Sequence, residues 1–197
     1  MAGSPKRVGV LALQGDFEAH RKALEAAGAV AGEVRTAAEL EGLDGLVIPG
    51  GESSTMLKLL EAERLTDALR EFGRTRPVFG TCAGAILLAH AVTGPVQPSL
   101  DLMDIDVERN AYGRQIDSRI ARIQADPEFE ARTRPPAELE AVFIRAPIIR
   151  RVGPETRVLA WYQGDPVLVE HGGRLAATFH PELTPDPRVH ELFVSKL

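Results

Sequence analysis

The chain has 197 residues, of which 44% are hydrophobic and 26% charged, and its formal net charge is -5 at pH 7. This length suits one domain with its own core, which we expect to span residues 1–197. The negative charge argues against a nucleic-acid-binding surface, and no apolar run is long enough for a membrane span. The single cysteine excludes an internal disulfide. Because no signal peptide precedes the first strand pattern, we expect a cytoplasmic protein.

The first half of the chain alternates between short apolar runs and amphipathic stretches. Nearly continuous apolar runs are typical of parallel strands that are buried on both faces. They predict strands at residues 8–13, 30–35, 45–48 and around 77–81. Helices are predicted at residues 17–27, around 56–60 and at 66–72, with a short helical turn at 37–40. This alternation predicts an α/β fold, a three-layer, doubly wound and mostly parallel sheet of the flavodoxin-like kind.

Helix ends in this half are marked by residues with short polar side chains or by glycine. Asp16 is expected to cap the first helix, and Gly28 is expected to end it. For the second helix we expect the cap to be Ser53, Ser54 or Thr55.

The second half is dominated by strand patterns. Between residues 103 and 108, apolar and acidic residues alternate, which indicates a strand with one wet face. Further strands are predicted at residues 116–123, 141–144, 157–162, 167–170 and 174–179, and a final helix at 187–196. Residues 126–140 are polar and contain proline, so we interpret them as a surface loop, with a helical turn within it as the alternative.

A nucleophile elbow is indicated where an apolar run enters Gly80-Thr81-Cys82-Ala83-Gly84 and a second apolar run follows. Such a turn from strand to helix needs small neighbours, because strand and helix pass close to the nucleophile. It would place Cys82 at a helix N-terminus, where the helix dipole favours a thiolate. A lone cysteine between apolar runs is also compatible with an inert core residue, so the elbow alone leaves both interpretations open.

Two other polar stretches follow predicted strands as Cys82 does: Gln14-Gly15 and Gly50-Gly51-Glu52. In doubly wound sheets, ligands bind at the carboxyl ends of the strands. Because all three stretches should lie on the same edge of the sheet, we expect one site there.

The segment His180-Pro181-Glu182 offers a base and an acid at short spacing. Proline biases the preceding residue towards extended geometry, in which side chains at i and i+2 share a face. Glu182 could then orient the imidazole of His180, as thiol activation requires; the alternative is a surface turn. The remaining histidines lack this context: His20 and His90 fall in predicted helices, His171 in a turn, and His190 at a helix position that we interpret as solvated.

Metal-binding and phosphate-binding patterns are not matched. A zinc deaminase would need further cysteines, His190-Glu191 lacks the second histidine of a zincin, and no Gly-Lys-Ser/Thr follows Gly50-Gly51. The order nucleophile, histidine, acid also differs from that of α/β-hydrolases. We therefore expect neither a metal nor a cofactor.

The elbow and the distant His-Pro-Glu together resemble class I glutamine amidotransferase domains. More specifically, the chain resembles the family of glutaminase subunits of pyridoxal 5′-phosphate synthase. The motifs that carry this resemblance are residues 11–16 (LALQGD), 49–55 (PGGESST), 107–115 (VERNAYGRQ), 143–147 (FIRAP) and 179–184 (FHPELT).

The resemblance implies that the chain hydrolyses glutamine through a thioester, with Cys82 as nucleophile, His180 as base and Glu182 as the acid that orients it. It further implies an oxyanion hole made by backbone N–H groups of Ala83 and the Gly50-Gly51 turn, and it links Gln14 to activation by a partner. The residues implied in binding glutamine are Gly50, Gly51, Glu52, Arg109, Ile144 and Arg145. Of these, Arg109 is the favoured contact for the glutamine carboxylate.

The partner implied by the resemblance is a PdxS-type synthase subunit, a (β/α)8 barrel that receives the ammonia, in an assembly of 12+12 subunits. Three alternatives stay open: a glutaminase subunit of another amidotransferase, a cysteine hydrolase that acts without a partner, and a non-catalytic regulatory subunit.

Overall fold

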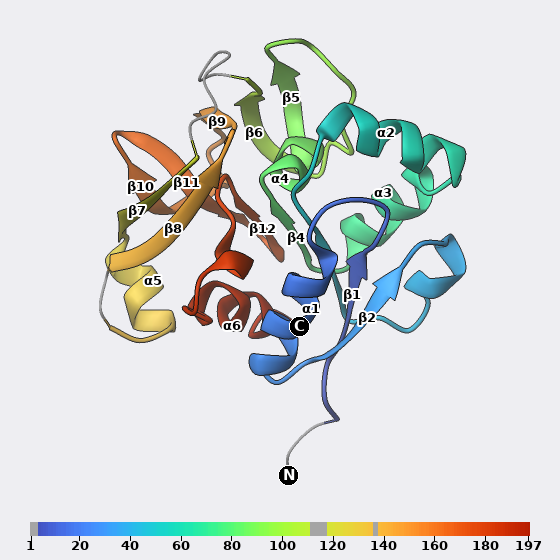
Figure 1. Cartoon of the computed structure of the whole chain (residues 1–197), viewed down its shortest axis with the longest axis horizontal. Coiled ribbons are helices and arrows are strands. Elements are labelled where there is room, and N and C mark those ends of the chain that lie inside the picture. The colour runs from blue at the N-terminus through green and yellow to red at the C-terminus, as the bar shows by residue number, and fades with distance from the viewer. Residues whose placement is uncertain (1–3, 111–117, 136–137) are drawn as a thin grey trace.

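In the computed structural model, residues 4–110, 118–135 and 138–197 are described. Among them, one sheet of nine strands crosses the molecule in the order β2-β1-β3-β4-β12-β11-β10-β7-β8 (Figure 1). A smaller sheet, β5-β6-β9, lies beside it. The α/β class predicted from the sequence is confirmed. No helix in the described ranges is both long and apolar enough to cross a membrane.

The parallel part of the large sheet contains the four strands predicted in the first half of the chain and the one predicted at residues 174–179. They are β2 (Val30–Val34), β1 (Arg7–Leu11), β3 (Gly45–Ile48), β4 (Val78–Thr81) and β12 (Arg174–Ala177). Neighbours in this order pair in parallel. The order is that of a flavodoxin-like sheet, in which the chain changes direction between β1 and β3 and leaves a crevice at their carboxyl ends.

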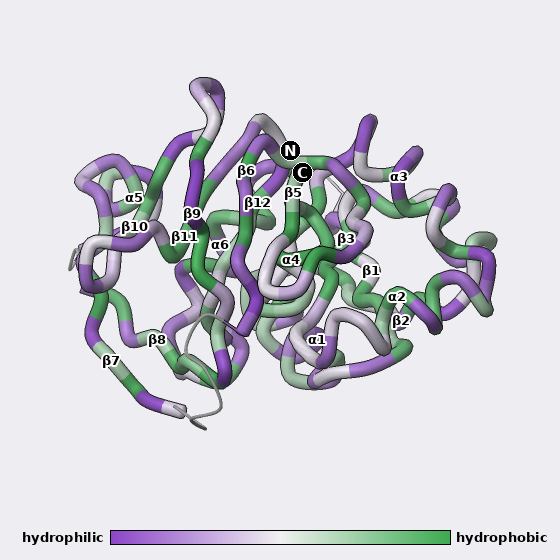
Figure 2. The backbone as a smooth tube through the Cα atoms, turned by 90° about the horizontal axis from the view of Figure 1, so that it is seen from above, coloured by the Kyte–Doolittle hydropathy of each residue, from purple (hydrophilic) through white to green (hydrophobic). Residues whose placement is uncertain are grey.

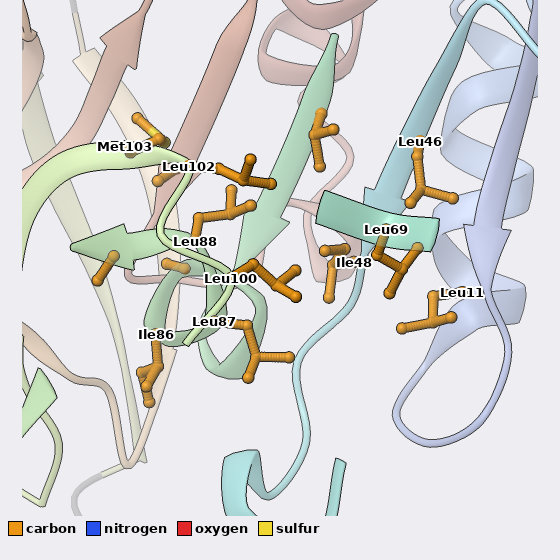
Figure 3. Close-up of a cluster of buried hydrophobic side chains, with 14 of the residues drawn as sticks. Leu11, Leu46, Ile48, Leu69, Ile86, Leu87, Leu88, Leu100, Leu102 and Met103 are labelled. Atoms are coloured by element: carbon orange, nitrogen blue, oxygen red, sulfur yellow. The ribbon is translucent and has the colours of Figure 1, made fainter. Parts of the chain in front are cut away.

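Each of these strands contributes side chains to two hydrophobic cores, one on each face of the sheet, because successive side chains point to opposite sides. In β3, Leu46 and Ile48 join the core under α2 (Ser53–Ala62), α3 (Thr66–Thr75) and α4 (Ala83–Leu88), part of which Figure 3 shows. Val47 joins the opposite core, which α1 (Phe17–Ala26) and α6 (Arg188–Val194) cover. In Figure 2 the tube is hydrophobic along α4 and mostly hydrophilic along α3, as expected for an inner and an outer helix.

The helix ends follow the predictions at α1 and differ at α2. Asp16 accepts a hydrogen bond from the backbone N–H of Ala19, and Gly28 adopts φ +88° just after α1. The cap of α2 is Glu52, whereas Ser53, Ser54 or Thr55 was predicted. A longer side chain takes this role because the Glu52 carboxylate reaches back to the N–H groups of residues 54 and 55.

Four antiparallel strands extend the sheet beyond β12: β11 (Asp165–His171), β10 (Arg157–Tyr162), β7 (Ser118–Ala125) and β8 (Glu138–Ile144). The four predicted strands fall within these, except that residues 116–117 lie outside the described residues. The predicted surface loop at 126–140 is wrong in part. It contains helix α5 (Pro127–Arg132) and the start of β8, because Phe129 is fully buried and anchors this polar segment in the core.

The small sheet consists of β5 (Ala89–Thr93), β6 (Met103–Glu108) and β9 (Ile148–Val152). The alternation in β6 is confirmed, since its apolar side chains are buried and its acidic ones are partly exposed. Strands β5 and β9 were not predicted, and His90, placed in a helix by the sequence pattern, lies in β5. The chain leaves α4 at Ala89 because strand pairing with β6 replaces the helical hydrogen bonds there.

We expect Gly84→Ala to destabilise the fold, because a Cβ atom there would lie 2.0 Å from the backbone oxygen of Ile48. Backbone cannot move aside as a side chain can, so we expect a loss of about 3 kcal/mol in unfolding free energy. Urea denaturation measures it. The control is Gly32→Ala in β2, where a Cβ would meet nothing within 4 Å. Equal unfolding midpoints for the two variants would show that α4 is not tightly packed on β3.

Candidate active site

The nucleophile elbow predicted from the glycine spacing is present at Cys82. This residue joins β4 to α4 with φ +48° and ψ -104°, a backbone conformation that few non-glycine residues adopt. Such conformations cost about 1–3 kcal/mol and persist where the surroundings hold them. Here the backbone N–H of Cys82 donates to the oxygen of Ala177, 2.8 Å away, at the end of β12. The structure therefore holds the thiol at the carboxyl edge of the sheet.

His180 and Glu182 lie together just beyond β12. His180 Nδ1 is 2.7 Å from Glu182 Oε1, and the Glu182 side chain is almost completely buried. An extended segment was predicted to bring these two side chains together, and that prediction is wrong. Pro181 instead begins a 3-10 turn (Pro181–Leu183), and the turn brings the two side chains together. The backbone N–H of His180 donates to the oxygen of Val142 in β8, so the antiparallel extension helps to hold the imidazole.

Cys82 and His180 meet at Gly50, in the turn that follows β3. A Cβ atom on Gly50 would lie 2.5 Å from His180 Cε1 and 3.4 Å from Cys82 Cβ. Glycine is therefore required here by close approach, and the thiol, the imidazole and the turn share one small space. On another side, Cys82 Sγ lies 3.8 Å from the backbone oxygen of Ile144.

The charge state of His180 follows from its two neighbours. Burial lowers the pKa of His180, but the hydrogen bonds and charges of Cys82 and Glu182 outweigh burial and raise it to about 10. At neutral pH the ring is therefore an imidazolium. It can stabilise an anionic sulfur and can donate a proton.

A cavity of about 320 Å³ opens over these residues. Its lining includes the nucleophile, the base and all residues that the sequence resemblance assigned to glutamine: Cys82, His180, Gly50, Gly51, Glu52, Arg109, Ile144 and Arg145. Residues that sequence reasoning missed also line it, among them Asp16, Ile86, Asn110 and Leu183. Its volume is in the range of small-molecule sites.

Glu52 and Arg109 form an ion pair inside this cavity, with Oε1 and Nη2 2.8 Å apart. Arg109 also donates to the side-chain oxygen of Gln97, which accepts a second hydrogen bond from Ser53. Partial burial raises the pKa of Glu52, but hydrogen bonds from Thr55 and Ser54 outweigh it and lower the pKa to about 2. The cavity thus contains fixed charges of both signs.

Arg145 and Arg109 differ in their surroundings. Arg145 is exposed at the cavity with φ +46°, and among the described residues no acidic side chain pairs with it. Arg109, which the sequence favoured as the contact for a substrate carboxylate, already has Glu52 as its partner. The motif at 107–115 continues beyond it, but residues 111–115 lie outside the described residues.

Two predicted residues, Gln14 and Ala83, do not line the cavity but lie next to residues that do. Gln14 packs against Gly51, where a Cβ would lie 3.2 Å from Gln14 Cδ, and its buried Oε1 has no hydrogen bond to a described residue. Gly51 itself has φ +146°, which favours glycine. Ala83 is the first residue of α4, directly after the thiol.

Two residues near the triad were not predicted. His20, expected only as a helix residue, is fully buried in α1, and its Nε2 lies 3.3 Å from Glu182 Oε2. His190 was interpreted as solvated, which is wrong, since it is fully buried and contacts His20. The spacing of Phe17, His20 and Leu24 on one helical face was the signal that could have placed His20 inside.

A cysteine on an elbow, faced by a carboxylate-bound histidine at the edge of a doubly wound sheet, defines the class of glutamine amidotransferases. Residues 10–197 match the SNO glutamine amidotransferase family, and the chain belongs to this family.

Individual relatives agree with this assignment. The chain is 66% identical to "Pyridoxal 5′-phosphate synthase subunit PdxT" of Solibacter usitatus, over 98% of this chain and 100% of that protein. It is 55% identical to the protein of the same name from Koribacter versatilis, over 95% of this chain and 94% of that one. A solved structure described as a glutamine amidotransferase superposes with a TM-score of 0.85 at 45% identity, covering 96% of this chain and 97% of that one.

Proposed function

We propose that this chain is the glutaminase subunit of a pyridoxal 5′-phosphate synthase and hydrolyses L-glutamine to glutamate and ammonia. The observation that carries the proposal is that Cys82 and His180 meet at one charged cavity, with the buried Glu182 bound to His180. It is supported by the 66% identity to a PdxT subunit over almost the whole chain.

In the first half of the reaction, the thiol proton of Cys82 resides on His180, so that the sulfur attacks as an anion. The Sγ–C bond forms at the side-chain amide carbon of glutamine, and the carbonyl electrons move onto oxygen. When the carbonyl re-forms, the C–N bond breaks, His180 gives its proton to the departing ammonia, and a glutamyl thioester remains. Glu182 keeps the ring in place and stabilises its positive charge throughout.

In the second half, His180 takes a proton from water, and the hydroxyl oxygen attacks the thioester carbon. The C–S bond then breaks and glutamate leaves. Both tetrahedral intermediates carry an oxyanion, for which backbone N–H groups of Ala83 and Gly51 are the proposed donors. One such donor lowers the barrier by about 3 kcal/mol in other enzymes. The position of Gln14 against Gly51 supports a role for its side chain in setting that turn.

Glutamine carries an ammonium and a carboxylate next to its side chain, and the cavity offers charges of both signs. We assign the ammonium to Glu52, which is ionised at neutral pH. The carboxylate is assigned to the cavity's cations, Arg109 and Arg145, and Ile144 also lines the cavity. Arg145 can bind it without breaking an internal ion pair, whereas Arg109 would share its charge between the substrate and Glu52.

Removing the charge of Glu52 tests this assignment. We expect Glu52→Gln to raise KM for glutamine about 10- to 100-fold with a smaller change in kcat, because a charged hydrogen bond contributes about 1.5–3 kcal/mol. Steady-state kinetics measure both constants. Glu39→Gln is the matched control, since Glu39 also accepts backbone hydrogen bonds at a helix start but does not line the cavity. An unchanged KM in the Glu52 variant would exclude it as the ammonium contact.

Ammonia released into water would be protonated and lost as a nucleophile, so such a glutaminase needs an acceptor enzyme docked over its cavity. We propose that the acceptor is a PdxS-type synthase subunit, in line with the names of the relatives. An assembly of 12+12 subunits and a cytoplasmic location are parts of the same proposal.

Ammonia release from glutamine, measured with and without a PdxS-type subunit, tests the proposed function. We expect hydrolysis to rise several-fold or more when the synthase subunit is added, and the two chains to co-elute in gel filtration. Equal hydrolysis in both cases would favour a partner-independent hydrolase. If only the synthase subunit of another amidotransferase stimulates hydrolysis, we would assign the chain to that pathway. If no condition gives hydrolysis, we would assign it the role of a regulatory subunit.

A further inference from the structure

A chain of buried polar side chains continues from the second carboxylate oxygen of Glu182. His20 Nε2 lies 3.3 Å from Glu182 Oε2 and 3.0 Å from Thr81 Oγ1, and His20 Nδ1 lies 3.0 Å from His190 Nε2. His20, Thr81 and His190 are fully buried, in α1, β4 and α6. Three elements of the fold therefore converge behind the acid of the triad.

The protonation of this chain follows from two independent contacts. Glu182 Oε2 is buried and makes no hydrogen bond with a described residue, so a bare Nε2 on His20 would place a lone pair 3.3 Å from a carboxylate. A proton on Nε2 replaces that repulsion by attraction. At the other end, His190 Nδ1 is buried and has no partner among the described residues.

The second contact selects the same arrangement. If His20 Nδ1 carried its proton, His190 Nε2 would accept it, and the proton of neutral His190 would sit on the buried, partnerless Nδ1. A buried N–H without an acceptor is costly. With the proton of His190 on Nε2, that N–H donates to His20 Nδ1 and only a lone pair is left unpaired. Thr81 Oγ1 can accept from Nε2–H or donate to a bare Nε2, so this contact selects neither form. The contacts at Glu182 and at His190 both favour His20 with its proton on Nε2.

Resting on the glutaminase function proposed above, we propose that His20 is a positioning residue of the reaction. Its Nε2–H, held in direction by His190 and hydrogen-bonded to Thr81, presents a positive dipole to Oε2 of Glu182. The carboxylate is thereby turned with Oε1 towards His180. Because Thr81 directly precedes Cys82, the same hydrogen bond links His20 to the strand that carries the nucleophile.

The buried side chains of His20 and His190 act through their dipoles and not through a charge. Burial above all, and then the neighbouring charges of His190 and His180, lower the pKa of His20 well below its usual value, and burial lowers the pKa of His190 to about 4. The titratable groups that face His20 are these two histidines and Glu182. At neutral pH His20 and His190 are therefore neutral, which leaves the imidazolium of His180 as the cation next to Glu182.

The tautomer of His20 can be observed directly in the full chain by two-bond ¹H–¹⁵N correlation spectra at pH 7.5, with His20→Gln used for assignment. We expect the pattern of a neutral ring protonated on Nε2. A ring protonated on Nδ1, or a doubly protonated ring, would overturn the proposal. This measurement needs no activity and no substrate.

Variants of His20 distinguish a positioning role from a role in packing alone. We expect His20→Leu to lower kcat for glutamine in the complex about 10- to 100-fold with little change in KM, as for other residues that orient a ligand from behind. We also expect the alkaline limb of activity to move to lower pH. His20→Gln, whose amide N–H takes the place of Nε2–H, should restore most of both. The control is His171→Leu, since His171 bonds to Thr156 and does not line the cavity.

Wild-type kcat and pH profile in a folded His20→Leu would overturn the proposal. If wild type proves inactive on glutamine, the function fails but the inference is still tested by the pH profile of Cys82 alkylation with iodoacetamide. A profile that shifts in His20→Leu and returns in His20→Gln supports the positioning role, and an unshifted profile refutes it. If His20→Leu does not fold, the tautomer spectrum decides.

Discussion

Replacing Cys82 by alanine is expected to lower glutamine hydrolysis by about 10⁴-fold or more, because the reaction then has no atom on which the acyl group can be carried. Folding should survive. Alanine keeps the buried Cβ, and the hydrogen bond from the backbone N–H to Ala177 does not involve the thiol. Docking on the synthase subunit should survive for the same reason. Coupled ammonia detection measures the first expectation, and thermal unfolding and gel filtration measure the others.

The matched control for Cys82→Ala is Thr75→Ala, a substitution of similar size at an exposed position of α3 that does not line the cavity. It should leave hydrolysis within a few-fold of wild type. Glutamine turnover by Cys82→Ala at more than a hundredth of the wild-type rate would show that the thiol is not the nucleophile. Hydrolysis would then have to proceed by direct attack of water, with His180 as the base.

The parallel half of the fold was predictable because its sequence signals are local. A strand buried on both faces is apolar throughout, as β3 is, and a glycine that directly follows an amphipathic stretch marks the end of a helix, as Gly28 does. The elbow was predictable for the same reason, since Gly84 must be small to let α4 pass the backbone of β3.

The antiparallel extension and the small sheet were less predictable because distant pairing decides them. Ala89 continues an apolar run that also suits a helix, and only pairing with β6 turns it into a strand. Phe129 stands alone in a polar segment, and its burial depends on a core assembled from other parts of the chain.

For the site, residue types and spacing could indicate the triad but not its supports. His-Pro-Glu indicated a base with its acid, yet the contact forms through a 3-10 turn that one proline does not specify. His20 and His190 are separated by 170 residues, so neither sequence neighbourhood shows that they touch. Likewise, the Glu52–Arg109 pair joins two motifs that were assigned separately to the substrate. The supports of the site therefore became visible only in the folded structure.

Glu182→Gln is expected to lower kcat by about 10⁴-fold, the effect of the corresponding acid-to-amide change in serine proteases. The amide is close in size to the acid but carries no charge, and its N–H₂ group can face Nδ1 and favour the wrong tautomer of His180. Glu182 is also one of the two groups that raise the pKa of His180 to about 10. Without it that pKa falls, so the alkaline limb of kcat/KM, expected near pH 10 in wild type, should move to lower pH.

Glu182→Gln should also change how the unfolding free energy depends on pH. The direction of this change follows from the linkage between proton binding and folding. The pKa of His180 is higher in the folded protein, about 10, than the ordinary value of 6.5. Its contribution to stability is therefore complete below pH 6.5 and is lost as the pH rises through 10. In Glu182→Gln the unfolding free energy should fall less over this interval, as measured by urea denaturation at a series of pH values. Glu191→Gln, which removes an ion pair with Arg134 at residues that do not line the cavity, is the control and should keep the wild-type slope. A Glu182 variant with the wild-type slope and alkaline limb would mean that the charge on His180 is set by Cys82 alone.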